Sequence, residues 1–292
     1  MTRTTPPRPI DVEAHFPELR AWRREAVRLH PRPGKPEVGD DSMGGPLLWP
    51  AEEPWPVCAG EHEDMGDGYP EEGEPLLVPI VQIRREAAPG VPFPEGRDLL
   101  QVLWCPFDHD NGFYCPEPRV FWRTAAEVGE VRPTPPAPAG APDRYVPVPC
   151  VLHPEAVADY GLQELDPGLC AELSERHGAV AAEAADHLDE LVQVPGTKLG
   201  GWPGWVQGPQ WPACAGCGQT AEHLLTVASW EFSPGSERLW LPLEDPEPPA
   251  GDDGFPPAMD PAGLMLGDAG SLQVFECRTC PGRPGAFGFD CS

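Results

Sequence analysis

Long apolar segments and a signal peptide are both absent from this sequence. No apolar run approaches the length of about eighteen residues that a membrane-spanning helix requires. The N-terminal residues lack the charged, apolar and small-residue regions of a secretory signal. We therefore expect a cytoplasmic protein with no membrane partner.

Basic residues are scarce. The chain has 20 Lys and Arg against 47 Asp and Glu, which gives a net charge of −27. Residues 1–37 carry +3 and residues 38–292 carry −30, and the segment 40–74 has eleven acidic residues and no Lys or Arg. Such a field repels nucleic acid and attracts basic partners. We expect no nucleic-acid partner, and two roles stay open for the acidic surface: binding a basic protein and maintaining solubility.

The common enzyme signatures are missing as well. The sequence has no Gly-x-Ser-x-Gly elbow, phosphate loop, dinucleotide fingerprint or His-Glu-x-x-His helix. Two histidines, His62 and His109, each lie between carboxylates that can tune a general base. A hydrolase or transferase that uses a Cys/His site in this part of the chain therefore remains an alternative.

Proline and glycine are abundant, with 43 Pro and 32 Gly in 292 residues. This level is typical of disordered sequence. Ten Trp and ten Phe indicate the opposite, because disordered chains lack large apolar side chains to bury. The composition predicts a folded, loop-rich protein.

One stretch of sequence occurs twice. Six residues recur at a constant offset of 156: Gly44/Gly200, Gly45/Gly201, Trp49/Trp205, Trp55/Trp211, Pro56/Pro212 and Cys58/Cys214. A second match, at an offset of 172, relates residues 100–105 to residues 272–277. Because Trp and Cys are rare, this recurrence predicts an internal duplication.

The repeats and the apolar patterns predict an α+β fold with two related, antiparallel, β-rich units, an N-terminal helix and linker helices. The expected divisions are an N-terminal tail and helix (1–37), repeat one (38–131), a linker with a strand and helices (132–194) and repeat two (195–292). The N-terminal helix should begin after Asp11 and end before Pro31. Further helices are expected at 167–176 and 179–192, and strands at 76–83, 99–104, 119–123, 145–152, 224–229, 238–241 and 271–277.

Cysteine spacing gives the clearest chemical signal. Repeat two has two Cys-x-x-Cys pairs, Cys214 with Cys217 and Cys277 with Cys280. Four thiolates form a closed tetrahedral zinc site of the structural kind, with no open position for catalytic water. Buried thiols or one redox-active pair are the alternatives, although no βαβ pattern supports a thioredoxin-like protein.

Repeat one has a different pattern at the equivalent places. Cys58 is followed by His62, and Cys105 is followed by His109, each four residues later. Two thiolates and two imidazoles are also a known zinc set. The alternative is that this repeat lost its metal and kept both cysteines in its core. Cys115 is a spare thiol nearby, and Cys150, Cys170 and Cys291 are assigned to packing.

The opening 198–205, the Cys214-x-x-Cys217 pair and the ending 267–277 together resemble the YwqG-like bacterial family. They are also similar to the related eukaryotic programmed cell death protein two family. The segment 75–85 with Gln82 resembles a family strand, and Thr226 replaces this glutamine in repeat two. The resemblance covers roughly 38–125 and 145–292, and its motif residues are Gly44, Gly45, Trp49, Trp55, Gln82, Gly200, Gly201, Trp202, Trp205 and Trp211.

The eukaryotic relatives imply a chaperone for a basic ribosomal protein, whereas the bacterial relatives, which often lie near toxin genes, imply immunity or client binding. The resemblance implies no enzymatic activity. We therefore expect a zinc-stabilised protein-binding module, a chaperone or sequestering factor for a basic client. A toxin-immunity protein and a Cys/His enzyme are the alternatives.

Overall fold

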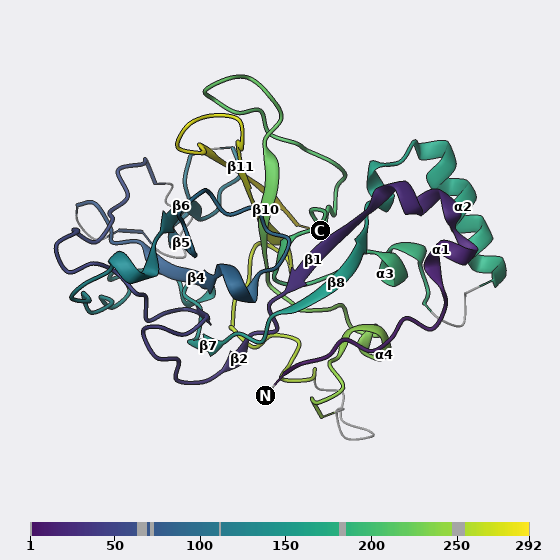
Figure 1. The fold of residues 1–292 in the computed structure, drawn as a ribbon, viewed down its shortest axis with the longest axis horizontal. Helices are drawn as coiled ribbons and strands as arrows, with labels where there is room; N and C mark the ends of the chain where they lie inside the picture. Colours follow the sequence, from purple (N-terminus) through teal and green to yellow (C-terminus); the bar gives the residue numbers. More distant parts are fainter. Residues whose placement is uncertain are drawn as a thin grey trace.

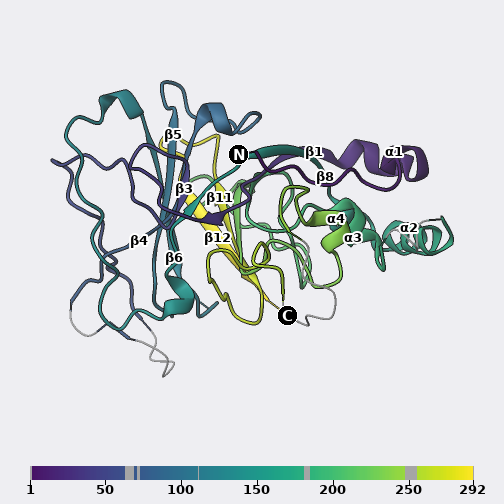
Figure 2. The ribbon, with the colours of Figure 1, turned by 90° about the horizontal axis from the view of Figure 1, so that it is seen from below.

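The computed structural model describes residues 2–62, 69–70, 73–110, 112–180, 185–246 and 255–291. Two six-stranded antiparallel sheets and a few short helices form the fold, which confirms the predicted α+β class. Figure 2 shows one sheet at the left, the other in the middle and the helices at the right. Within the described residues, no helix is long and apolar enough to cross a membrane.

Sheet A has the strand order β12 (Gly285–Asp290), β11 (Ser271–Glu276), β10 (Glu222–Ala228), β9 (Lys198–Gly200), β1 (Arg23–Arg28) and β8 (Glu155–Tyr160). Sheet B has the order β6 (Glu117–Arg123), β5 (Leu99–Cys105), β4 (Val78–Arg84), β3 (Ser42–Met43), β7 (Cys150–Val151) and β2 (Arg32–Pro33). The helices are α1 (Val12–His15), α2 (Pro167–Val180), α3 (Leu188–Val192) and α4 (Glu237–Trp240). The 3-10 turns are η1 (Pro17–Trp22), η2 (Arg85–Ala87), η3 (Ala125–Glu127), η4 (Asp143–Tyr145) and η5 (Leu162–Glu164).

The main core lies between the two sheets. On β5, Leu100 and Val102 belong to this core, whereas Leu103 and Cys105 belong to a second cluster with Trp49 on the outer face. A third cluster packs α2, α3 and α4 against the other side of sheet A, where Figure 1 shows the helices. Strand β5 therefore has apolar residues on both faces.

Equivalent strands pair in the same register within each of the two sheets. Ser42 pairs with Gln82 between β3 and β4, and Lys198 pairs with Thr226 between β9 and β10. A β-bulge lies between residues 79 and 81 of β4 and between residues 223 and 225 of β10. Thr226 thus occupies the place in sheet A that Gln82 occupies in sheet B.

Each sheet includes one strand that comes from a distant part of the chain. In sheet A, Arg28 of β1 pairs with Lys198 of β9 and with Glu155 of β8. In sheet B, Val151 of β7 makes the corresponding pairs with β3 and β2. The N-terminal strand β1 therefore joins the strands of repeat two, and β7 joins those of repeat one.

The predicted N-terminal helix is mostly wrong. Asp11 does cap a helix, because its carboxylate accepts hydrogen bonds from the backbone N–H groups of Glu13 and Ala14. This helix ends at His15, and Pro17 starts a 3-10 turn. Residues 23–28 then form β1, because pairing with β8 and β9 outweighs their helical apolar spacing.

Two smaller predictions also need correction. Residues 237–240 form helix α4 instead of part of a strand at 238–241. Of the strand predicted at 145–152, only Cys150–Val151 pairs in a sheet, since the segment has prolines that cannot donate to a ladder. The helix predicted at 167–176 is confirmed as α2, which continues to Val180. The helix predicted at 179–192 is only partly right: residues 188–192 form α3, residues 185–187 are not helical, and residues 181–184 lie outside the described part of the chain.

Candidate metal centres

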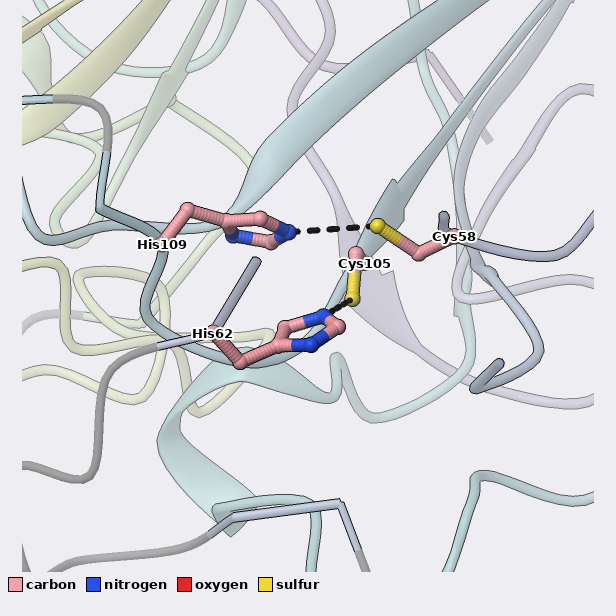
Figure 3. A group of neighbouring side chains, drawn as sticks. All are labelled: Cys58, His62, Cys105 and His109. Carbon is pink, nitrogen blue, oxygen red and sulfur yellow. Dashed lines mark hydrogen bonds between the residues drawn. The ribbon is translucent and has the colours of Figure 1, made fainter. Parts of the chain in front are cut away.

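Centre one consists of Cys58, His62, Cys105 and His109, whose donor atoms all lie within 4.8 Å of one another. Cys105 ends β5, and His62 and His109 form an isolated β-bridge. Figure 3 shows the four side chains converging, with Cys58 Sγ 3.2 Å from His109 Nε2 and Cys105 Sγ 3.2 Å from His62 Nε2. The structure thus brings together the four predicted residues of repeat one.

The contacts in centre one fit a tetrahedral ion. Bonds of about 2.3 Å to sulfur and about 2.1 Å to nitrogen place the two donors about 3.5 Å apart, close to the observed distances. His109 Nδ1 lies 3.2 Å from the carbonyl oxygen of Cys115, which directs Nε2 toward the cluster. Figure 3 shows the His62 ring turned toward Cys105. The donor set suits a four-coordinate metal ion.

Electrostatic coupling in centre one favours one thiolate, at Cys58. Hydrogen bonds from the Cys105 thiol and from His109 lower the pKa of Cys58, whereas the hydrogen bond to Cys58 and burial raise the pKa of Cys105. Burial opposes the charged form of His109, but the neighbouring Cys58 raises its pKa overall. A thiolate held between proton donors is a ready ligand, because metals bind the deprotonated form.

Centre two consists of Cys214, Cys217, Cys277 and Cys280, again within 4.8 Å. The sulfurs of Cys214 and Cys280 are 3.9 Å apart, and those of Cys217 and Cys277 are 3.7 Å apart. A tetrahedral four-sulfur site requires about 3.8 Å, whereas a disulfide requires about 2.05 Å. Backbone N–H groups of Cys280 and Thr279 lower the pKa of Cys277 to about 7. The predicted cluster can therefore hold a metal ion.

The two centres have the same backbone scaffold. In repeat one the N–H of Cys58 donates to Pro75, and in repeat two that of Cys214 donates to Gln219. The N–H groups of Gly60 and Gly216 donate to the preceding cysteine sulfurs at 3.4 and 3.3 Å. Sixteen residues (59–74) separate Cys58 from Pro75 in the sequence, whereas four (215–218) separate Cys214 from Gln219. Seven of the eleven acidic residues in the segment 40–74 fall in this longer interval.

The motif tryptophans pack beside these centres. Trp49 and Trp55 lie 5.2 Å apart, and Trp205 and Trp211 lie 5.7 Å apart between ring centroids. One carboxylate, that of Glu164, accepts the indole N–H of both Trp205 and Trp211 at 2.9 Å. Glu164 was not identified from the sequence, because it lies outside the motifs, on η5.

Other motif residues shape the backbone. Four glycines at equivalent positions, Gly44, Gly45, Gly200 and Gly201, have positive φ angles. Gln82 accepts the N–H of Leu48 at 2.7 Å and donates to two backbone carbonyls. Of the remaining cysteines, Cys115 and Cys150 are buried, and burial raises the pKa of both thiols.

A cleft that the sequence did not reveal lies on sheet A. Its volume is about 600 Å³, and three tryptophans line it: Trp22, Trp202 and Trp211. Segments from both halves of the chain contribute, including Gly90 and Thr220. None of its lining residues belongs to centre one. Two of these tryptophans, Trp202 and Trp211, are motif residues, but the sequence did not show that they meet Trp22, because the walls come from separate segments of the chain.

No protein-family model matches the chain and no curated protein matches it, so the resemblance to the YwqG-like family stays a prediction from the motifs.

Proposed function

We propose that this chain is a non-enzymatic protein-binding module, stabilised by two zinc ions, that acts as a chaperone or sequestering factor for a basic client protein. One observation carries the structural part of the proposal. Four protein donors converge at each centre, at the ends of corresponding strands β5 and β11. Such closed sets are typical of structural zinc, which contributes folding free energy directly.

The surroundings of centre one support a structural role over catalysis. Asp108, which flanks His109, is buried and accepts a hydrogen bond from the Tyr145 hydroxyl at 2.9 Å. It also pairs with Arg144 at 3.5 Å. A carboxylate engaged in this way orders the backbone near the ligand. With both imidazoles committed to the ion, neither is free to act as a general base.

The charge of the molecule supports a basic partner. A net charge of −27 speeds the encounter with a basic protein and disfavours nucleic acid. Exposed acidic residues that follow Cys58 in the sequence, such as Glu61 and Glu74, add to this field. The YwqG-like resemblance leads to the same proposal. A basic toxin would complement the negative charge of the chain as any other basic client would.

The test is a comparison of basic and acidic proteins of similar size as ligands for the immobilised zinc-loaded chain. We expect measurable binding for basic proteins, with an association rate that falls as salt rises. Binding of acidic proteins or nucleic acids alone, or rates that do not change with salt, would contradict the proposal.

A further inference from the structure

The tryptophan cleft on sheet A has rigid aromatic walls. The indole N–H of Trp202 donates to the carbonyl oxygen of Trp22 at 2.8 Å, and that of Trp211 donates to Glu164 at 2.9 Å. The ring centroids of Trp22 and Trp202 are 5.7 Å apart, and those of Trp202 and Trp211 are 6.3 Å apart. The rings are therefore held in place before any ligand arrives, which reduces the entropic cost of binding.

One face of Trp202 already carries a guanidinium group. The Arg24 guanidinium carbon lies 3.3 Å from the ring centroid, and its Nη1 lies 3.4 Å from the carbonyl oxygen of Gly201. Arg24 is otherwise an exposed residue. This contact shows that the cleft has both the aromatic face and the acceptor that a planar guanidinium uses.

The charges around the cleft favour a cation. Three carboxylates line it, from Glu25, Glu164 and Glu222, against two guanidinium groups, from Arg24 and Arg278. Arg278 is engaged by Glu222 and Glu276, both at 3.1 Å. If Arg24 swings into solvent, the lining keeps an excess of negative charge beside an open indole face.

We propose that the cleft binds an arginine side chain on an extended segment of the basic client, with the guanidinium replacing Arg24 on Trp202. This inference rests on the proposed function, because a basic client supplies the arginine. Arginine fits better than lysine, since its planar group stacks on indole while donating to several acceptors. The cleft volume of about 600 Å³ also leaves room for neighbouring residues of the segment.

Centre two supports one wall of this cleft. Trp211, Thr220 and Ala221 line the cleft. The N–H of Ala221 donates to Pro212 at 2.8 Å, and Thr220 forms a β-bridge with Ala213, directly before Cys214. Loss of the metal from centre two should therefore loosen this wall and weaken binding.

The experiment uses the full-length zinc-loaded chain and three peptides of about twelve residues, in which Arg, Lys or Glu alternates with Gly and Ser. Isothermal titration at constant salt measures each affinity. We expect the Arg peptide to bind about tenfold more tightly than the Lys peptide, with no binding of the Glu peptide. Preference for the Glu peptide, or equal affinity for Arg and Lys, would overturn the proposal.

Variants locate the site. Arg24→Ala should tighten binding of the Arg peptide several-fold, because it removes the competing guanidinium. Glu222→Gln should weaken it by a similar factor, and its side chain is 51% exposed, so folding should be unaffected. Glu127→Gln is the matched control, because this acidic residue is 73% exposed and does not line the cleft. Weaker binding by Arg24→Ala, or equal effects of Glu222→Gln and Glu127→Gln, would exclude this cleft.

The same variants separate this inference from the proposed function. If a basic protein binds with salt-dependent rates and the cleft variants have no effect, the cleft proposal is wrong and the proposed function survives. If no basic protein or Arg peptide binds the wild-type chain, both proposals fail.

Discussion

Lys198 and Asp159 form an ion pair that is almost completely withdrawn from water, with side-chain exposures of 1% and 0%. Asp159 accepts the Lys198 ammonium at 2.9 Å and the backbone N–H groups of Val194 and Trp202 at 2.9 and 2.8 Å. The pair thus fixes the turn that leads into β9 and the tryptophan segment. In repeat one, Ser42 occupies the place of Lys198. The ion pair at this position therefore belongs to repeat two and not to repeat one.

We expect Asp159→Ala to lower the free energy of unfolding by about 3–5 kcal/mol, because it leaves a buried ammonium without its partner. Lys198→Met should cost less, since Asp159 keeps its two backbone donors. Urea unfolding monitored by tryptophan fluorescence measures both values. A larger loss for Lys198→Met than for Asp159→Ala would contradict this account of the turn.

His30 should make stability depend on pH. Burial lowers its pKa from 6.5 to about 4 despite a hydrogen bond with Glu155. Between these pKa values the unfolded chain binds more protons than the folded chain, so the free energy of unfolding falls as the pH drops. From about pH 7.5 to about pH 5.5 this group should remove about 1 kcal/mol. The variant His30→Asn suits the positive φ of 43° at this residue. In urea unfolding it should lack the loss of about 1 kcal/mol between these two pH values. An unchanged pH dependence of the free energy of unfolding would refute the assignment.

The residues of the two candidate metal centres could be predicted from the sequence because they occur in pairs at short, characteristic spacings. Glu164, Lys198 and Arg24 could not be placed in this way. Lys198 pairs with Asp159, Glu164 with Trp205 and Arg24 with Gly201, each at least 39 residues away, and nothing in the local sequence identifies these pairs. Packing of distant segments, which determines these contacts, leaves no periodic pattern in the chain.

The turn after β9 depends on glycine. Gly201 has a φ of +64°, and a Cβ there would lie 2.7 Å from Ala26 Cβ and would also collide with Asp159. We therefore expect Gly201→Ala to destabilise the protein by about 3 kcal/mol or more. Gly204→Ala is the control, since nothing lies within 4 Å of its Cβ position, and it should change stability by less than about 1 kcal/mol. Equal melting temperatures for the two variants would show that the turn is not constrained as described.

Five strands were predictable from the sequence: β4, β5, β6, β10 and β11. Their apolar residues follow a strand pattern and lie in short, clearly bounded segments. The placement of β1 in sheet A and of β7 in sheet B was not predictable, because β1 has helical apolar spacing and β7 has only two paired residues. The matching registers and bulges of the two sheets are what the predicted duplication requires, and the duplication itself stays a prediction. The helices α2 and α3 lie between β8 and β9 and have no helical counterpart between β2 and β3.

The acidic surface should control the rate of association with a basic client. Exposed Glu52 and Glu74 are suitable for neutralisation. Glu53 is not, because it forms a two-point ion pair with Arg123, and Glu71 and Glu72 lie outside the described residues. We expect Glu52→Gln with Glu74→Gln to slow association about twofold at low salt and to leave dissociation unchanged.

Stopped-flow measurement of both rate constants across salt concentrations is the test of this prediction. Screening limits the field to about 8 Å at physiological ionic strength, so the difference from wild type should vanish there. Glu53→Gln should instead lower the melting temperature. If the double variant changes dissociation alone, the acidic residues act by contact and not by steering.

Metal content tests the central claim most directly. Elemental analysis of the purified chain should find about two zinc ions per molecule. Cys217→Ser, at the exposed ligand of centre two, and His62→Ala, in centre one, should each leave about one ion, and the combined variant should leave none. Each loss should also lower the melting temperature. A wild-type protein that melts at the same temperature with and without a chelator, and that contains no metal, would contradict the account.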